Sequence, residues 1–530
     1  MAVDSIKSII RSAKSFFSGT LLSRVSGMIR DMSMAAAFGS DPGVAALLVS
    51  FRFSNLLRRL FGEGALHSAF VPLFEELRSL ETKRAAVFFR DLSFSLMAFL
   101  FLVTFIVEAA LLFFLFFGNL DPDNREIVYL TAVMFPSILF ICHFGLNSSL
   151  LQCEKKYFIP SIAPAGFNFV WIAATYYFKG YSVEAAMPKL SAAIVFACFI
   201  QWAITVPHCI HLLFKAFSKE DWRSFSFFSS DVRSMLKPLA SGIIGIGAVQ
   251  INTALDAVFA RYADLEGPAY LWYAIRIQQL PLALFGIALA GALLPPLSRA
   301  IKEKDSSRFK CFFSFSIRYC INIMLPISFF ILVLGGAAVA ILYGRGDFND
   351  LSAYHTILCL WGYAIGLLPM AFASLFSVAL YAKGNYGIPM RGSLAAVFFN
   401  VILNGFIVFF LKMGASGIAL ATSISAWINF LFLLCYLLRK GYIENVPVVL
   451  RHLCKVGASS FLSALFTWIF AVFVWEDKTL WILFSNDLAT FPRSLLEQAA
   501  IFVSLSFCFF ASLLLFFKLF KIRFFLVDKS

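Results

Sequence analysis

Residues 24–40 read RVSGMIRDMSMAAAFGS, and residues 44–76 read VAALLVSFRFSNLLRRLFGEGALHSAFVPLFEE. Both segments are mostly apolar and long enough to form helices, yet both contain charged side chains. An Arg inside a membrane-spanning helix costs roughly 2.5–3.5 kcal/mol on insertion scales, so several of them need a polar cavity to face. The charged residues of the two segments are Arg24, Arg30, Asp31, Arg52, Arg58, Arg59 and Glu63.

The composition indicates that these segments belong to a membrane protein. Of 530 residues, 60% are hydrophobic and 14% are charged, whereas about a quarter of the residues of an ordinary globular protein are charged. Apolar runs of about 18 residues or more recur to the end of the chain, which predicts an all-α polytopic membrane protein. The basic N-terminal stretch MAVDSIKSIIRSAKSFF lacks an apolar core with a cleavage site, so we expect it to be retained.

The distribution of Lys and Arg predicts the topology. These residues concentrate in the N-terminal tail, in the loops after even-numbered spans and in the C-terminal tail, which places both termini in the cytoplasm. The net charge of +14 is therefore mainly a topology signal, and we expect no nucleic-acid partner. The longest loops, near 66–90, 215–235 and 298–310, are charged. The fourteen expected spans are 15–37, 43–65, 91–118, 127–152, 159–178, 190–214, 236–262, 269–297, 311–342, 353–382, 388–411, 415–438, 453–475 and 496–520.

An internal repeat predicts two lobes. One fixed offset places Arg52 on Arg276, Leu60-Phe61-Gly62 on Leu284-Phe285-Gly286 and Pro72-Leu73 on Pro296-Leu297. The second span thus matches the eighth, which indicates a parallel repeat about an axis along the membrane normal. We therefore expect an N-lobe at 1–230, a C-lobe at 231–440 and two further helices at 441–530.

The charges in the second span have two interpretations. On a helix, Arg52, Asn55, Arg59 and Glu63 share one face, so Glu63 can pair with Arg59. Arg58 and Arg59 lie near a cytoplasmic helix end, where arginines also serve as membrane anchors. We expect Arg58, Arg59 and Glu63 to form a cytoplasmic gate, with anchoring as the alternative.

The charges in the first span and its surroundings point to an anionic substrate. Arg24 and Asp31 share a helix face, and the whole set has more positive than negative charge, which predicts a net cationic, water-filled cavity. Because guanidinium groups bind phosphate oxygens bidentately, a phosphate-bearing substrate is expected. The residues expected to bind it are Arg24, Arg30, Asp31, Arg52 and Arg276.

Four polar residues in the second half of the chain are candidates for a cation site. Asp256 is an acid within an apolar span, Asn400 and Asn404 are one helical turn apart, and Thr422 lies in a later span. Oxygen ligands of this kind suit a hard cation such as sodium. Hydrogen bonding between helices is the alternative for the amides, and a salt bridge to Arg261 or a proton relay is the alternative for Asp256.

Signals for catalysis are absent from the sequence. There is no Walker lysine motif and no GxGxxG pattern. A transporter without enzymatic activity and without a bound organic cofactor is therefore expected.

Several motifs resemble one known family. SRVSGMIRD at 23–31 and FRFSNLLRRLFGEGALHSAFVPLFEE at 51–76 are similar to the signature of the MurJ (MviN) family of lipid II flippases. Three later segments resemble further landmarks of that family: YAIRIQQLPLALFGIALAGALLPPLS, KGNYGIPMR and SGIALATS. The resemblance covers about residues 15–440 and a two-helix C-terminus.

This resemblance implies a V-shaped, fourteen-helix alternating-access transporter of the multidrug/oligosaccharidyl-lipid/polysaccharide exporter superfamily. Its lobes would enclose a cationic cavity, and the last two helices would form a groove for the polyprenyl tail. The implied function is transfer of lipid II from the inner to the outer leaflet of the bacterial cytoplasmic membrane. The implied partners are lipid II, the membrane and the cell-wall synthesis machinery, and the protein is expected to be a monomer.

The resemblance also assigns residue roles. The family's essential arginines fall on Arg24, Arg30, Arg58 and Arg276, and its acids on Asp31 and Glu63. A further family Asp falls on Ala45, so its role is lost or moved to Asp41. A sodium site of some members would consist of Asp256, Asn400, Asn404 and Thr422, with Asn404 standing where those members have Asp.

Three other functions fit parts of the pattern. A cation-coupled drug exporter of the same superfamily would need unpaired acids in its cavity, whereas this chain offers arginines. A flippase for another lipid-linked oligosaccharide fits the charge equally well and differs only in the motifs. A membrane scaffold would need no solvated chamber lined by Arg24, Arg30 and Arg276.

Overall fold

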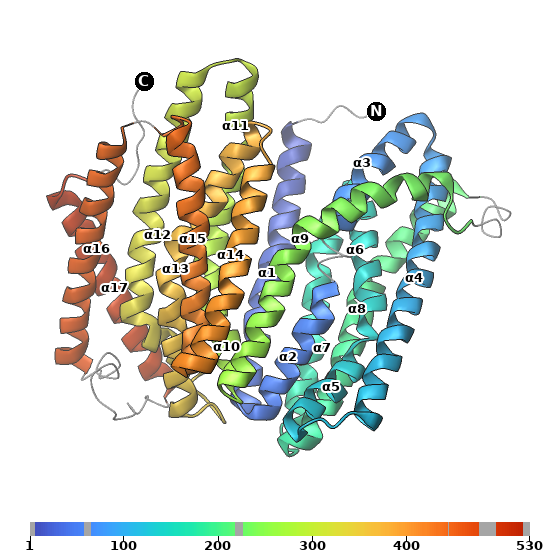
Figure 1. Ribbon diagram of the computed structural model, residues 1–530, viewed down its shortest axis with the longest axis horizontal. Coiled ribbons are helices and arrows are strands. Elements are labelled where there is room, and N and C mark those ends of the chain that lie inside the picture. Colours follow the sequence, from blue (N-terminus) through green and yellow to red (C-terminus); the bar gives the residue numbers. More distant parts are fainter. Residues whose placement is uncertain (1–5, 58–64, 218–225, 444, 476–493, 523–530) are drawn as a thin grey trace. The chain divides into compact units, whose positions relative to one another are not determined.

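The computed structural model describes residues 6–57, 65–217, 226–443, 445–475 and 494–522, and every regular element in these ranges is a helix (Figure 1). The chain forms two compact units, Met1–Ala254 and Leu255–Ser530. Helix α9 (Ser230–Ala263) begins at the expected lobe boundary and contributes residues to both units. The division into two lobes and a C-terminal pair remains a prediction.

In the part of the first unit that the structure describes there are nine consecutive helices, of which α9 ends in the second unit. Within it, α7 packs between α1 and α8, α6 packs on α8, and α2 packs on α5. The helices are α1 (Ile6–Phe38), α2 (Pro42–Leu57), α3 (Ala65–Leu80), α4 (Thr82–Phe117), α5 (Pro122–Met134), α6 (Ser137–Cys153), α7 (Phe158–Phe178), α8 (Val183–Ala216) and α9.

Helix α3 corrects one expectation, because the stretch near 66–90 is not a loop. Leu66, Phe70, Phe74 and Leu77 recur at helical spacing and are buried against α4 and α6. The charged residues on the other positions of this amphipathic helix made the stretch resemble a loop.

The second unit is organised around α13 (Asp350–Ala382). It is the most buried of the helices that are long and apolar enough to span a membrane, and it packs on α10, α11, α12 and α15. Gly362 and Gly366 let α15 approach closely, since an added Cβ at Gly366 would lie 2.5 Å from the Ser423 hydroxyl. The other elements are α10 (Gly267–Pro281), π-helix η2 (Leu282–Ile287), α11 (Ala288–Lys302), α12 (Ser306–Tyr343), α14 (Gly387–Phe406), π-helix η3 (Ile407–Leu411), α15 (Gly414–Arg439), α16 (Val446–Trp475) and α17 (Leu495–Leu519).

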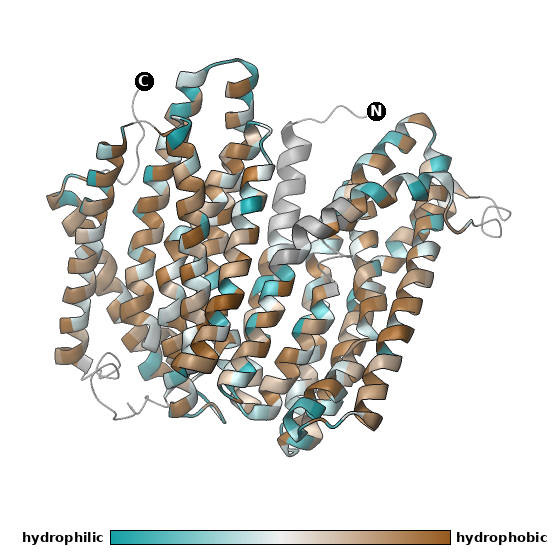
Figure 2. Cartoon of the chain, viewed as in Figure 1, coloured by the Kyte–Doolittle hydropathy of each residue, from teal (hydrophilic) through white to brown (hydrophobic). Residues whose placement is uncertain are grey.

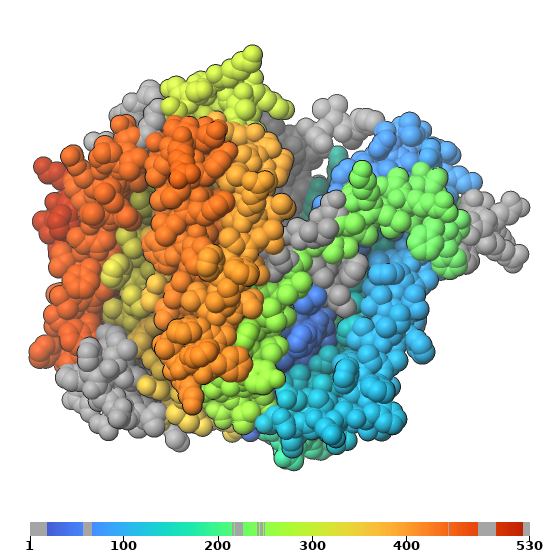
Figure 3. Space-filling model, viewed as in Figure 1, coloured from blue at the N-terminus to red at the C-terminus, as the bar shows by residue number. Residues whose placement is uncertain are grey.

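Among the described residues, ten helices are long and apolar enough to cross a membrane, or eleven if the bent pair α5 and α6 forms one span. This pair bends by 48° next to Pro136, which cannot continue the backbone hydrogen-bond ladder. Figure 2 shows that these helices consist largely of hydrophobic residues, and α4 and α15 lie at the surface of their units in Figure 3. The fold is therefore that of a multi-pass membrane protein, and the number fourteen stays a prediction.

Candidate functional site

Arg30 of α1 is buried in the first unit with side chains from α7. Its Nε and Nη2 donate to Asp31 Oδ1 at 3.0 and 2.7 Å, and its Nη1 donates to Asn168 Oδ1 at 3.1 Å. The guanidinium carbon lies 4.7 Å from the ring centroid of Trp171, within cation–π distance. Arg30 is 6% exposed and Asp31 is 3% exposed. The Arg30 charge is thus compensated by Asp31 in this conformation.

Asn168 is the residue that ties this ion pair to the backbone of α1. Its amide nitrogen donates to the carbonyl of Ser23 at 3.1 Å and to the hydroxyl of Ser26 at 3.0 Å. The same side chain therefore accepts from Arg30 and donates to the turn that precedes it. This double role fixes the spacing between α1 and α7 at the level of the candidate site.

Arg24 and Arg52 have different surroundings from Arg30. Arg24 is exposed on α1, two turns before Asp31. Although these two residues share a helix face, the ion-pair partner of Asp31 is Arg30. Arg52 of α2 is partly buried, and its Nη1 donates to the carbonyl of Thr253 on α9 at 3.1 Å. Thr253 precedes Asp256 by one turn, so Arg52 attaches α2 to the helix that contributes the candidate cation ligand.

Arg276 of the second unit lies on α10 in an aromatic environment. Its guanidinium carbon is 4.4 Å from the ring centroid of Trp272, one turn earlier on the same helix, and Trp272 is buried. The Arg276 side chain is itself partly exposed. Stacking on a buried indole holds the guanidinium plane in place.

The predicted cytoplasmic gate cannot be placed in the structure. Arg58, Arg59 and Glu63 lie outside the described residues. Their assignment therefore stays a prediction.

The four candidate cation ligands come together in the second unit from three helices. Asn404 of α14 donates through Nδ2 to Asp256 Oδ1 at 2.7 Å and to Asn400 Oδ1 at 2.9 Å. Thr422 of α15 is 3.5 Å from Asp256 Oδ2, and Asn400 Nδ2 is 3.5 Å from the Thr422 hydroxyl. The expected hydrogen bonding between helices is therefore present, and Arg261 donates to the carbonyl of Leu265.

The donor set of this cluster also fits a hard cation. It offers one carboxylate, two amide oxygens and one hydroxyl, all of the ligand type that sodium prefers. Asn400 and Asn404 are 1% and 0% exposed, and the Oδ1 of Asn404 is buried without a hydrogen-bond partner among the described residues. A buried acceptor without a donor costs free energy unless a positive group meets it, and a cation at that oxygen would meet this need.

Ala45, which stands where the MurJ family resemblance implies an Asp, lies in the interior of the first unit. Ala45 is fully buried on α2, so a carboxylate there would be buried too. Asp41 instead caps the start of α2, since its Oδ1 accepts from the backbone N–H of Gly43 at 2.8 Å. A capping role accounts for Asp41 in this conformation.

Sequence patterns alone did not single out Asn168 and Trp171 as part of the candidate site. The available signal was the Asn in the apolar stretch GFNFVW, three residues before a Trp. An Asn inside a spanning helix usually bonds to a neighbouring helix. Its partner here lies 138 positions earlier in the sequence.

Comparisons with known proteins agree on one family. The family model described as "Lipid II flippase MurJ" matches residues 34–485. "Probable lipid II flippase MurJ" of Chlamydia muridarum (strain MoPn / Nigg) is 32% identical over 520 residues, which cover 97% of this chain and 94% of that protein. "Lipid II flippase MurJ" of Burkholderia cenocepacia is 26% identical over 464 residues, covering 86% of this chain and 89% of that one.

Two solved structures have a fold similar to that of this chain. The structure titled "Lipid II flippase MurJ, inward closed conformation" aligns with a TM-score of 0.70 at 23% identity, covering 94% of this chain and 99% of that chain. An inward-facing multidrug resistance MATE family transporter of the MOP superfamily aligns with a TM-score of 0.62 at 16% identity, covering 81% and 98%. Because the family model matches most of the sequence and the Chlamydia relative aligns over almost the whole length, the chain belongs to the lipid II flippase MurJ family.

Proposed function

We propose that the protein moves lipid II, the undecaprenyl-pyrophosphate-linked precursor of peptidoglycan, from the cytoplasmic to the outer leaflet of the inner membrane. Membership of the lipid II flippase MurJ family is the observation that supports this function. In this proposal the protein is a monomer with fourteen membrane-spanning helices. It works by alternating access of two repeated lobes, and α16 and α17 lie beside the lipid tail. Contact with the cell-wall synthesis machinery is part of the proposal.

The proposed topology has both termini in the cytoplasm, as the Lys and Arg distribution predicts. The ends of α4, α12 and α8 that carry Phe117, Tyr343 and Val183 then face outward. Arg58, Arg59 and Glu63 would lie at the cytoplasmic end of the second span and act there as a gate.

The pyrophosphate would be held by arginines. Arg24 is exposed and Arg276 is partly exposed, so both guanidinium groups can meet an anion directly. Arg30 is engaged by Asp31 and would contribute positive potential, or bind phosphate once that pair opens. Arginine suits this task because its planar group gives two parallel hydrogen bonds to phosphate oxygens.

Removing Arg24 or Arg276 is expected to weaken lipid II binding strongly. A hydrogen bond to a charged group contributes about 1.5–3 kcal/mol, so each Arg→Ala change should weaken binding roughly 10- to 100-fold. The measurement is growth of a flippase-depleted bacterium that expresses Arg24→Ala or Arg276→Ala, together with lipid II binding to the purified variants.

The matched control is Arg233→Ala, which removes an exposed arginine of α9 that is not a candidate ligand. It should restore growth as wild type does. Full rescue by both Arg24→Ala and Arg276→Ala at equal expression would rule out the pyrophosphate role.

The cluster of Asp256, Asn400, Asn404 and Thr422 is proposed to bind sodium. A bound sodium ion would supply positive charge that holds α9, α14 and α15 together. The residues of this chain provide the oxygens, and the Asp256 carboxylate provides the compensating negative charge. Binding to the folded state alone raises stability by about 2.7 kcal/mol at one hundred times the dissociation constant.

Asp256→Asn is expected to abolish stabilisation by sodium. The substitution keeps an oxygen that can accept from Asn404, but it removes the charge that a cation requires. The measurement is the melting temperature of the purified protein in sodium chloride and in choline chloride at equal ionic strength. Wild type should melt higher in sodium chloride, and the variant should melt equally in both salts.

Asn404→Asp is the complementary variant, since a second carboxylate should strengthen sodium binding. If sodium raised the melting temperatures of wild type and Asp256→Asn equally, the proposed sodium site would be wrong. Transport that is independent of sodium and survives Asp256→Ala would contradict its role in the cycle.

A further inference from the structure

Helix α4 presents a long apolar surface to its surroundings. It is the least buried of the described helices that are long and apolar enough to cross a membrane. The side chains of Phe105, Phe113 and Phe116 are each more than half exposed. A large exposed apolar surface marks a contact with a membrane or with another protein, and in a multi-pass membrane protein the acyl chains of lipids meet it first.

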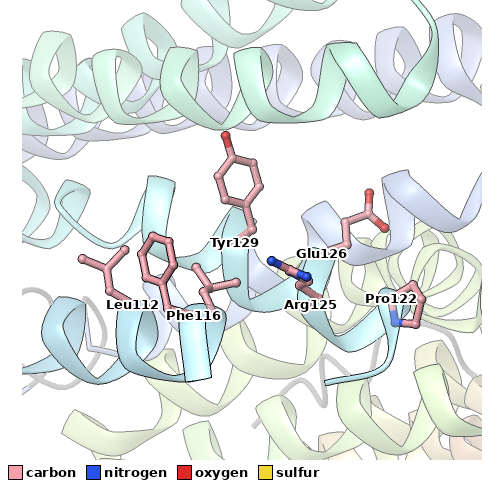
Figure 4. Close-up of a pocket in the computed structure, with 7 residues that line it drawn as sticks. Leu112, Phe116, Pro122, Arg125, Glu126 and Tyr129 are labelled. Carbon is pink, nitrogen blue, oxygen red and sulfur yellow. The ribbon is translucent and has the colours of Figure 1, made fainter. Parts of the chain in front are cut away.

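A groove lies at the C-terminal end of this surface, between α4 and α5. Its volume is about 500 Å³, which is within the usual size range of small-molecule sites. Its lining includes Leu112 and Phe116 of α4 and Arg125, Glu126 and Tyr129 of α5. Figure 4 shows the apolar side chains of α4 on one side and the polar side chains of α5 on the other. The groove therefore offers an apolar wall and a polar wall to the same ligand.

Arg125 supplies an uncommitted guanidinium group to the polar wall. It is exposed, and no described residue forms a hydrogen bond or an ion pair with its side chain. The hydroxyl of Tyr129, one turn later, likewise has no hydrogen-bond partner in the described part of the chain. Because a guanidinium group forms two parallel hydrogen bonds to phosphate oxygens and a phenol can add a third, these two side chains suit a phosphodiester group.

Acidic residues surround Arg125 in the sequence. From Asp121 to Glu126 there are three acids and one base, and Glu126 itself lines the groove. A headgroup with a phosphate and no positive charge would be repelled by this surplus of negative charge. A headgroup that has an ammonium group beside its phosphate matches both signs, since a primary ammonium group can donate hydrogen bonds to a carboxylate.

The apolar wall has the length that one leaflet of a membrane requires. Between Glu108 and Asp121 the sequence contains no charged residue, and these twelve residues lie on α4 and in the turn that follows it. A helix of this length rises about 18 Å, whereas half of the hydrocarbon region of a bilayer is about 15 Å thick. A lipid whose headgroup is held at Arg125 can therefore lay an acyl chain along α4 without meeting a charge.

We propose that this groove binds the headgroup of one phosphatidylethanolamine molecule. Arg125 and Tyr129 donate hydrogen bonds to the phosphate oxygens, and the primary ammonium group donates to the carboxylate of Glu126. The topology proposed above places this end of α4 outward, so the lipid belongs to the outer leaflet. The bound headgroup joins α4 to α5. The site is separate from the arginines proposed to hold pyrophosphate and from the sodium cluster.

Native mass spectrometry of the full-length protein tests the assignment. The protein is released from micelles that contain equal amounts of phosphatidylethanolamine, phosphatidylcholine and phosphatidylglycerol with the same acyl chains. Phosphatidylcholine has the same net charge, but its quaternary ammonium group cannot donate a hydrogen bond. Phosphatidylglycerol keeps the phosphate and lacks the ammonium group. We expect wild type to retain one phosphatidylethanolamine molecule in preference to the other two lipids.

Two variants separate the contributions of the two charges. Arg125→Ala should weaken phosphatidylethanolamine binding about tenfold or more, because it removes hydrogen bonds between charged groups. Glu126→Gln should reduce the preference for phosphatidylethanolamine over phosphatidylglycerol, because it removes the charge that the ammonium group meets. Since the Arg125 side chain makes no hydrogen bond within the described protein, Arg125→Ala should melt at the same temperature as wild type once both are stripped of lipid.

Arg233→Ala is the matched control, since it removes an exposed arginine of α9 and should leave lipid retention unchanged. Equal retention of the three lipids by wild type, or unchanged retention of phosphatidylethanolamine by Arg125→Ala, would overturn the proposal. A protein dimer that Arg125→Ala dissociates would also overturn it, because the groove would then belong to a second copy of the chain. The measurement requires no lipid II transport, so its failure is distinguishable from failure of the proposed function.

Discussion

Arg30→Ala is expected to lower the free energy of unfolding of the first unit by about 3–5 kcal/mol, because it leaves the Asp31 carboxylate buried without its partner. Asp31 is 3% exposed and accepts two hydrogen bonds from Arg30. The substitution also removes the hydrogen bond to Asn168 and the contact with Trp171. Thermal unfolding of the purified protein in detergent measures the loss.

The double variant Arg30→Ala/Asp31→Ala separates the ion pair from the rest of the contacts. It should be more stable than Arg30→Ala, because no buried charge is left uncompensated. Arg30→Lys should remain destabilised, since an ammonium group cannot reach Asp31 and Asn168 together while stacking on Trp171. If Arg30→Ala were as stable as wild type, the buried Arg30–Asp31 pair would not contribute to stability in the way expected.

Arg90→Ala is expected to destabilise the first unit to a similar degree, about 3–5 kcal/mol, without a direct effect on substrate. Arg90 and Asp91 are both 3% exposed and are joined at 2.6 Å, and Asp91 also accepts from the backbone N–H of Ser226 at 3.4 Å. Loss of Arg90 should therefore loosen the segment before α9 as well as α4. Thermal unfolding and hydrogen exchange at the Ser226 amide measure the two effects.

The comparison of the two arginines separates stability from transport. Both form buried pairs with the next residue, but only Arg30 belongs to the proposed pyrophosphate site. At equal amounts of folded protein, Arg90→Ala should transport lipid II normally and Arg30→Ala should not. Equal transport by the two variants would show that Arg30 acts only as a structural residue.

The spans and the cation cluster were predictable from the sequence because their signals are local or belong to a family motif. Asn400 and Asn404 recur one turn apart, and Asp256 and Thr422 are polar residues within apolar spans. The structure brings these four residues together within hydrogen-bonding distance. What remained hidden was the environment of each arginine.

Arg30 illustrates why. Side chains of adjacent residues on a helix point in different directions, so a bond between Arg30 and Asp31 is not expected from spacing. The long guanidinium side chain bends towards its neighbour because α7 provides Asn168 and Trp171 on that side. A partner from a distant helix cannot be inferred from periodicity within one helix.

The two π-helical segments have a consequence for how the chain can change during evolution. Segment η2 continues directly from α10, the helix of Arg276, and leads without a break into α11. Segment η3 begins three residues after Asn404. A π-turn accommodates an inserted residue within an α-helix and is often found at functional sites. Deleting one residue from η2 would restore an ordinary α-helix and rotate Arg276 by about 100° relative to α11. Relatives that differ by one residue in length at these two places would therefore present Arg276 or Asn404 to a different neighbour, even where the flanking sequences are identical.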